Sequence, residues 1–167
     1  NVEAGGTLAM GLSVGTLTIG SLDLDGDLDV EIDTNTTYSA GVDHDQLVVT
    51  GAVDIAGGTL KGSTIGGGLL NPATGGDLAI IDGGGAVTSP FAGFDPALGT
   101  NYLGSERVAS IAYNGGDGSD VIVTLSNGFT PIGEWRNGYW GSPLNAGPGQ
   151  NTANPDSDTL PNILEFA

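Results

Sequence analysis

The chain has 167 residues, including 31 Gly and 8 Pro, and its 20 acidic residues against three Lys and Arg give a formal net charge of -17. The Gly and Pro content disfavours a largely helical fold, and the charge excludes nucleic acid as a partner because it repels phosphate backbones. Because cysteine is absent and no apolar run approaches the ~18 residues of a membrane span, we expect no disulfide, no thiol chemistry, no cysteine-ligated zinc and no membrane span.

The N-terminal residues predict β-structure. Apolar and polar residues alternate with a period of two across residues 7–33, and Gly interrupts the alternation every five or six residues. We treat residues 1–20 as an N-terminal β segment. Since no stretch of similar length precedes it as a partner, we expect it to donate a strand to a neighbouring copy of the chain. An equally good interpretation is that it forms the first strands of its own domain.

Residues 21–126 are expected to form the main β module. Glycine-rich stretches separate its apolar segments and supply turns, because Gly adopts positive φ without steric cost. Short strands joined by such turns predict an all-β fold: an antiparallel β-sandwich of the jelly-roll type, with a short β-solenoid as the alternative. Besides the N-terminal alternation, the strands that we predict span residues 46–50, 53–56, 78–82, 107–113 and 120–126.

A change in composition near Asn127 marks a C-terminal extension, residues 127–167. Pro, Asn and Gly are frequent here and predict an extended loop, and the one helix that we expect begins near Pro161. Three aromatic residues fall within six positions: Trp135, Tyr139 and Trp140. Their rings are interpreted either as a platform on which a glycan stacks or as an anchor that docks the extension onto the sheets.

Four glycine-rich stretches carry a resemblance to a known kind of protein. They are GTLTIGSLDLDGDLDVEID, HDQLVVTGAVDIAGGTLKG, GGDLAIIDGGGAV with SPFAGF, and IAYNGGDGSDVIVTL. In this order, residues 15–125 resemble the glycine-rich β module of autotransporter-like and adhesin-like passenger regions in bacterial surface proteins. The tail NPDSDTLPNILEFA is similar to an acidic calcium-binding segment that follows such modules in some exported proteins. The resemblance implies export, a structural or adhesive role and no catalysis.

The tail also carries the spacing of an EF-hand-type calcium loop. Ca²⁺ prefers six to eight oxygen ligands, which alternate residues of a curling loop and a closing bidentate Glu can supply. Positions 1, 3, 5, 7 (through its carbonyl) and 12 of the loop pattern are Asn154, Asp156, Asp158, Leu160 and Glu165. The neutral Asn154, and Thr159 in place of Gly, depart from the pattern. The alternative is a solvated acidic loop in which Asp158 caps the final helix.

A second acidic pattern precedes Thr34. Six acids alternate with apolar residues: Asp23, Asp25, Asp27, Asp29, Glu31 and Asp33. In one strand they would share a face at intervals of ~6.6 Å and would repel one another. Calcium bridging to an adjacent strand or subunit would offset this repulsion, with Asp23, Asp25, Asp27 and Asp29 as the candidate ligands. The alternative is a wet strand face whose carboxylates are screened by salt.

Three weaker motifs receive structural interpretations. Residues 115–123 fit one copy of a calcium-binding nonapeptide, but a single copy favours a tight hairpin that enters a strand at Asp120. His44 lies between Asp43 and Asp45, and we expect these carboxylates to raise its basicity rather than to form a catalytic pair. Asn35 begins the chain's N-x-S/T sequon and is expected in a surface loop.

These observations predict a non-enzymatic β protein that is secreted by a bacterium or held at its surface. Its expected role is that of a fibre or adhesin subunit that assembles with copies of itself by strand addition and is stabilised by Ca²⁺. The chain begins with Asn1 rather than Met, which is typical of a processed product. A calcium-dependent glycan-binding module is the alternative, and a fragment of a glycan-cleaving enzyme is a third interpretation, although the sequence shows no nucleophile constellation, phosphate loop or zinc spacing.

Overall fold

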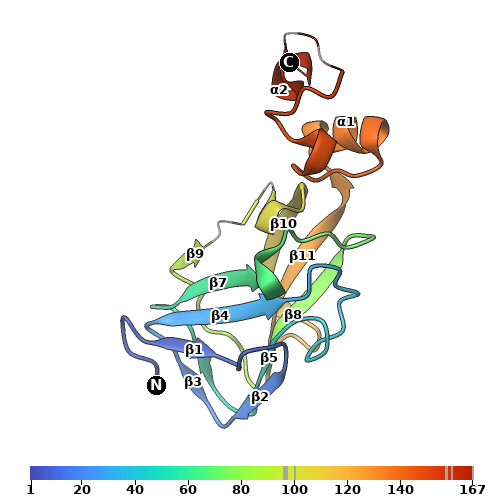
Figure 1. Ribbon diagram of the computed structural model, residues 1–167. Coiled ribbons are helices and arrows are strands. Elements are labelled where there is room, and N and C mark those ends of the chain that lie inside the picture. Colours follow the sequence, from blue (N-terminus) through green and yellow to red (C-terminus); the bar gives the residue numbers. More distant parts are fainter. Residues whose placement is uncertain (96–97, 100, 157, 159, 167) are drawn as a thin grey trace.

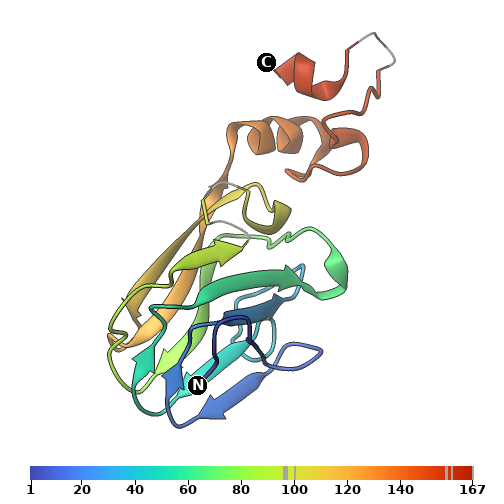
Figure 2. The same cartoon turned by 90° about the vertical axis from the view of Figure 1, so that its left-hand side faces the viewer.

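Short strands account for most of the regular structure in the computed structural model, which describes residues 1–95, 98–99, 101–156, 158 and 160–166. The prediction of a mainly β fold is confirmed. The strands belong to three sheets that surround one apolar core, and the C-terminal extension stands beyond the end of the sheets (Figures 1 and 2).

The three sheets differ in how their strands pair. The first sheet is parallel throughout, in the order β1 (Thr7–Ala9), β4 (Asp27–Ile32), β7 (Thr59–Thr64) and β9 (Gly93–Asp95). The second sheet has the order β2 (Thr16–Ile19), β5 (Gln46–Val49), β8 (Gly76–Gly83), β11 (Asp120–Phe129) and β10 (Arg107–Gly115). The third sheet pairs β3 (Leu22–Asp23) with β6 (Val53–Asp54) in parallel, and single bridges at Val2 and Val87 extend it.

The chain visits the three sheets in turn and therefore coils. Val2, β1 and β2 form the first coil, β3 to β5 the second, and β6 to β8 the third, while Val87, β9 and β10 form the fourth. Successive coils stack in parallel register, and β11 turns back between β8 and β10. Within the described residues, antiparallel pairing between strands is limited to β8, β11 and β10, and one isolated antiparallel bridge joins Ile32 to His44. The stack thus has the connectivity of a short β-solenoid, whereas the predicted sandwich requires antiparallel pairs throughout.

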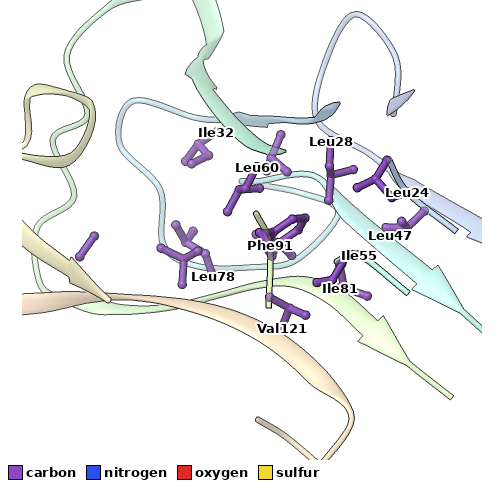
Figure 3. Packing of buried hydrophobic residues seen from close by; sticks show 14 of the residues in the cluster. Leu24, Leu28, Ile32, Leu47, Ile55, Leu60, Leu78, Ile81, Phe91 and Val121 are labelled. Carbon is purple, nitrogen blue, oxygen red and sulfur yellow. The ribbon is translucent and has the colours of Figure 1, made fainter. Parts of the chain in front are cut away.

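Alternating side chains of the second and third coils point into the core (Figure 3), and those of the first coil are partly buried against it. In β4 the apolar residues are buried and the acids between them are partly exposed, as the period of two predicts. Leu28 stacks on Leu60, and Leu47 on Ile81, so that apolar columns run through the stack. Each fully buried side chain of this kind contributes about 1.5 to 3 kcal/mol. Phe91 closes the core at the level of β9.

Two strands lie where the sequence predicted turns or no regular structure. Residues 57–68 belong to the glycine-rich stretches that were expected to supply turns. Instead, β7 occupies 59–64 and pairs with β4 along its whole length. Gly62 lies within β7 rather than in a turn. Glycine is needed there because a Cβ atom at this position would lie 2.5 Å from the Tyr102 hydroxyl. The glycine marks a close approach inside a strand. β9, which pairs with β7, was also missed.

The motif at residues 115–123 forms the predicted hairpin. β10 and β11 pair in antiparallel fashion, with Gly115 opposite Asp120. The amide of Gly118 donates to the carbonyl of Gly115 at 2.7 Å and closes the turn. The motif therefore reverses the chain between two strands.

The coils approach one another closely at their corners. A Cβ atom at Gly26 would lie 2.3 Å from the carbonyl oxygen of Gly6 and 2.7 Å from that of Glu3. These are backbone atoms of the first coil, which cannot rotate away as a side chain can. Glycine is therefore required at this corner for packing.

The Gly26→Ala substitution is expected to lower the free energy of unfolding by about 1 to 3 kcal/mol, because the added methyl group forces the first two coils apart. Gly20→Ala is the matched control, since a Cβ atom there meets nothing within 4 Å. Urea unfolding followed by circular dichroism gives both values. Equal effects of the two substitutions would contradict the close packing at Gly26.

The extension contains two α-helices among its described residues, α1 (Pro131–Trp140) and α2 (Asn162–Phe166), and the short 3-10 helix η3 (Gly147–Gly149). The helix predicted near Pro161 is confirmed, but the expectation that it is the one helix is wrong, because the aromatic residues lie on α1. Thr130 caps α1 by accepting from the amide of Gly133 at 3.2 Å, and Gly141 ends the helix in the left-handed conformation. None of the described helices has the length and apolar character needed to cross a membrane.

Candidate functional site

The alternating acids do not share one strand face. Asp23 belongs to β3 in the third sheet, whereas Asp27 and Asp29 belong to β4 in the first sheet. The chain bends between them at Asp25 and Gly26. The side chains point outward as predicted, but the corner of the coil divides them between two surfaces.

The neighbours in the sheet reduce the repulsion between these acids. Asp27 lies between Thr7 and Thr59, and Lys61 lies directly opposite Asp29. The Lys61 ammonium contacts the Asp27 carboxylate at 2.9 Å, and this hydrogen bond and charge raise the pKa of Lys61. On the first sheet, the acidic strand is thus paired with neutral residues and with the chain's sole lysine.

Asp23 is different, because it lies directly opposite Asp54 in the parallel pair of β3 and β6. Both carboxylates are exposed. Among the residues that the structure describes, no group of three or more His, Asp or Glu side chains gathers in the manner of a metal site.

The tail brings three of its predicted ligands into one curled loop. The Asn154 side-chain amide donates to the carbonyl of Asp158 at 2.6 Å, and the amide of Asp158 donates to the Asp156 carboxylate at 3.4 Å. Asp158 in turn accepts from the amide of Leu160 at 2.6 Å, which forms a local turn before α2 begins. The side chain of Glu165 and the whole of Thr159 lie outside the described residues.

Asn162 adds an oxygen donor that the sequence interpretation did not include. It stands at position 9 of the loop pattern and is 1% exposed. Its side-chain amide group donates to the carbonyls of Pro148 and Gln150 at 2.6 and 2.8 Å, while its side-chain oxygen has no partner among the described residues. A buried amide oxygen that accepts no hydrogen bond from them fits the ligand chemistry of Ca²⁺.

A buried ion pair fixes the extension to the coils. The Arg136 guanidinium on α1 contacts the Glu106 carboxylate at 2.8 Å, and both side chains are almost fully buried. The Thr130 hydroxyl donates to the second carboxylate oxygen at 2.6 Å. Arg136 also donates to the carbonyl of Pro143 and to the side chain of Asn151. We name these five residues the Glu106 network; the sequence analysis missed it.

The other arginine serves the β module. Arg107 donates to the carbonyls of Ser126, Asn127 and Pro72 at 2.9, 2.7 and 3.1 Å, and its guanidinium lies over the Phe129 ring. Burial lowers the pKa of Arg107. Because both arginines are buried, Lys61 is the one cationic side chain that reaches solvent.

His44 is buried, and the expectation of raised basicity is wrong. Neither ring nitrogen has a hydrogen-bond partner of good geometry among the described residues, and desolvation lowers the pKa of His44 by more than the charges of Asp43 and Asp45 raise it. The flanking carboxylates are engaged by other groups. Asp45 accepts from the backbone amides of Gly15 and Glu31, and Asp43 accepts from the hydroxyl of Thr37.

This lowered pKa predicts a pH dependence of stability. Below pH about 6.5 the unfolded chain binds a proton at His44 that the folded chain does not, so the free energy of unfolding falls as the pH falls. The slope is about 1.4 kcal/mol per pH unit, and it ends at the folded pKa. The His44→Met variant should lack this slope in urea titrations between pH 8 and 5. Parallel pH curves for the two proteins would contradict the account.

The aromatic residues of α1 line a groove together with the tail. The groove has a volume of about 520 Å³ and is lined by Trp135, Tyr139, Trp140, Pro155 and Asp156. The ring centroids of Trp135 and Trp140 are 4.9 Å apart, and Trp135 also packs on Phe166 of α2. The trio thus joins α1 to α2, rather than to the sheets, and leaves Tyr139 largely exposed.

Both ends of the coiled stack carry little charge. Residues 1–21 contain one charged side chain, Glu3, and residues 83–105 contain one, Asp95. The 61 residues between these stretches hold eleven of the 20 acids. The apolar side chains of the first coil, Leu8, Leu17 and Ile19, are only half-buried, and Leu12 is fully exposed. Depletion of charge around half-buried apolar residues is typical of the core of a protein interface.

Comparison with known proteins adds no family: no family model, no curated protein and no solved structure matches the chain. The function is therefore argued from the geometry of the ends, the tail and the groove.

Proposed function

We propose that the protein is a non-enzymatic structural module, outside a bacterial cell, that polymerises end to end. In this arrangement the fourth coil of one copy stacks on the first coil of the next, and the C-terminal extension, which stands at the fourth-coil end, lies beside the contact (Figures 1 and 2). The observation that supports it most directly is the pair of charge-poor ends on an otherwise acidic stack. A subunit interface at these ends buries the half-covered apolar residues without bringing acids together.

The strand directions are compatible with this stacking. In the first sheet, the free edges are β1 and β9, and both run parallel to the strands between them. In the second sheet, β10 is antiparallel to β11, which is antiparallel to β8, so β10 runs in the same direction as β2 at the other edge. The strand directions therefore permit parallel pairing with a neighbouring copy in either sheet. Because the first sheet has four strands per copy and the second has five, a single translation continues only one of them without a gap or an overlap.

The side chains at these edges are also compatible. The column of Leu8, Leu28, Leu60 and Phe94 runs through the first sheet. A stacked copy extends it by placing its own Leu8 beside Phe94 and its Ala9 beside Asp95. Such a contact joins two different surfaces and does not close on itself, so it produces filaments.

In this proposal the N-terminal segment stays in its own chain and is not donated to a neighbouring copy. β1 and β2 pair with β4 and β5 of their own chain. Strand addition then uses their outer edges, which remain free within the described chain.

The substitution Ala9→Asp tests the interface, because it places a carboxylate beside Asp95 of the next copy. Ala9 is exposed but lies directly opposite Asp29 of its own chain, so the melting temperature of each monomeric variant is measured first and only variants with an unchanged fold are compared. Ala9→Lys is the matched control, since its ammonium would face the same carboxylate. Sedimentation velocity and electron microscopy should show fewer and shorter polymers for Ala9→Asp than for Ala9→Lys. Identical assembly of both variants, or a monomer at every concentration, would overturn the proposal.

Calcium is part of the proposal in two places. In the tail, Asn154, Asp156, Asp158, the Leu160 carbonyl and Glu165 would hold the ion, with the unpartnered oxygen of Asn162 as a further donor. On the coils, Asp23, Asp25, Asp27 and Asp29 would bind it more weakly and reduce the repulsion between stacked acidic copies. The charge of -17 otherwise opposes polymer growth.

Calcium should therefore raise the melting temperature relative to chelator. A ligand that binds only the folded state adds about 2.7 kcal/mol at a hundredfold excess over Kd. In the tail, Glu165→Gln should remove one bound ion in equilibrium dialysis, because it removes the bidentate ligand. The same melting temperature in chelator and in millimolar calcium would contradict the metal proposal.

A further inference from the structure

The aromatic groove is the feature that end-to-end assembly leaves unused. Its walls are not one flat platform: the ring planes of Trp135 and Trp140 meet at 80°, and those of Trp135 and Tyr139 at 51°. A pyranose ring stacks on a flat, open aromatic face and needs several polar partners for its hydroxyl groups. With centroids 4.9 and 5.5 Å apart, these rings pack directly against one another, so they line the groove as one contiguous aromatic cluster.

Among the described residues that line the groove, Asp156 has the one charged side chain, and it is exposed. The arginine of the same helix, Arg136, is buried and paired with Glu106, so it does not compete for this carboxylate. Lys61, the solvent-exposed cation, lies on β7 in the coils. In the calcium-free protein, the groove thus combines aromatic rings with a negative charge that no described cation neutralises.

We propose that the groove binds a cationic ligand whose charge is carried by an alkylated ammonium group. Aromatic faces attract a cation within about 6 Å of the ring centroid, and quaternary ammonium groups are recognised by aromatic cages. Such a group has no hydrogen-bond donor, so a groove with few polar acceptors suits it. The volume of about 520 Å³ is that of a small-molecule site.

Choline is the probe, and its binding is measured by the intrinsic fluorescence of the protein. Both tryptophans of the chain, Trp135 and Trp140, line it, so intrinsic fluorescence measures this site alone. The titration is carried out in chelator, which makes it independent of the calcium proposal. The neutral isostere 3,3-dimethylbutan-1-ol has the shape of choline without its charge. We expect a saturable change with choline and about tenfold weaker binding of the isostere.

Two variants test whether the Asp156 carboxylate contributes to choline binding. Asp156→Asn should weaken choline binding about 3- to 10-fold. Asp82→Asn is the matched control, because it removes an equally exposed charge from β8, away from the groove. Choline should bind this variant with unchanged affinity.

Three results would overturn the proposal. The first is equal binding of choline and its neutral isostere, which would show a merely apolar groove. The second is an unchanged affinity for choline in Asp156→Asn. The third is a saturable fluorescence change with a neutral oligosaccharide such as cellohexaose but none with choline, which would assign the groove to glycans. Failure of end-to-end assembly would leave all of these results unaffected.

Discussion

Arg136→Met is expected to destabilise the extension by about 3 to 5 kcal/mol, because it leaves the Glu106 carboxylate buried without its cation. The Thr130 hydroxyl remains as a donor, but one neutral hydrogen bond does not replace a guanidinium. Tryptophan fluorescence during urea unfolding measures the effect, since both tryptophans belong to α1.

The double variant Glu106→Gln with Arg136→Met separates the loss of the pair from the burial of a lone charge. It removes both charges, and its stability should lie well above that of Arg136→Met alone. If the single and double variants are equally unstable, the ion pair is not what joins α1 to the coils. Circular dichroism of the strands in the same samples shows whether the coils unfold together with the extension.

Removal of residues 1–20 is expected to have the largest effect on the coils. The first coil covers the second: Leu8 stacks on Leu28, Leu17 on Leu47, and Val2 bridges to Leu24. At about 1.5 to 3 kcal/mol for each buried side chain, the loss approaches the 5 to 15 kcal/mol that is typical of a whole domain. The truncated chain should lose most of its β signal at room temperature.

Circular dichroism and electron microscopy of the truncated protein distinguish this result from strand donation. A donor strand that pairs only with a neighbour would leave a folded, soluble remainder that does not polymerise. A truncated protein with an unchanged melting temperature would contradict the assignment of residues 1–20 to the first coil. Restoring the segment as a separate peptide is a further control, because it should refold the second coil if it binds there.

The sequence indicated which residues face the core but not how the strands pair. The alternation in β4 correctly separates buried leucines from outward acids. The parallel stacking was undetermined, because the stacked residues Leu8, Leu28, Leu60 and Phe94 are 20, 32 and 34 residues apart. Loops of different length between the sheets remove the regular period by which stacked repeats are recognised.

The sequence also did not predict the pKa of His44, helix α1 or the Glu106 network. Asp43 and Asp45 flank His44 in sequence, but backbone amides and a hydroxyl occupy their oxygens, so burial decides the pKa of the histidine. In α1, Gly133 and Gly138 obscured a helix whose Thr130 and Gly141 caps were both readable. The Glu106 network joins residues up to 45 positions apart and depends on the tertiary fold.

X-ray diffraction from oriented polymers tests end-to-end stacking most directly. If copies continue the sheets, the strands lie across the fibre, and a reflection near 4.7 to 4.9 Å appears along the fibre axis. Each copy adds one subunit repeat on the same axis, about 19 Å if the four-stranded sheet continues without a gap and about 24 Å if the five-stranded sheet does. A strand reflection perpendicular to the fibre axis, or a protein that stays monomeric in calcium at every concentration, would contradict the account.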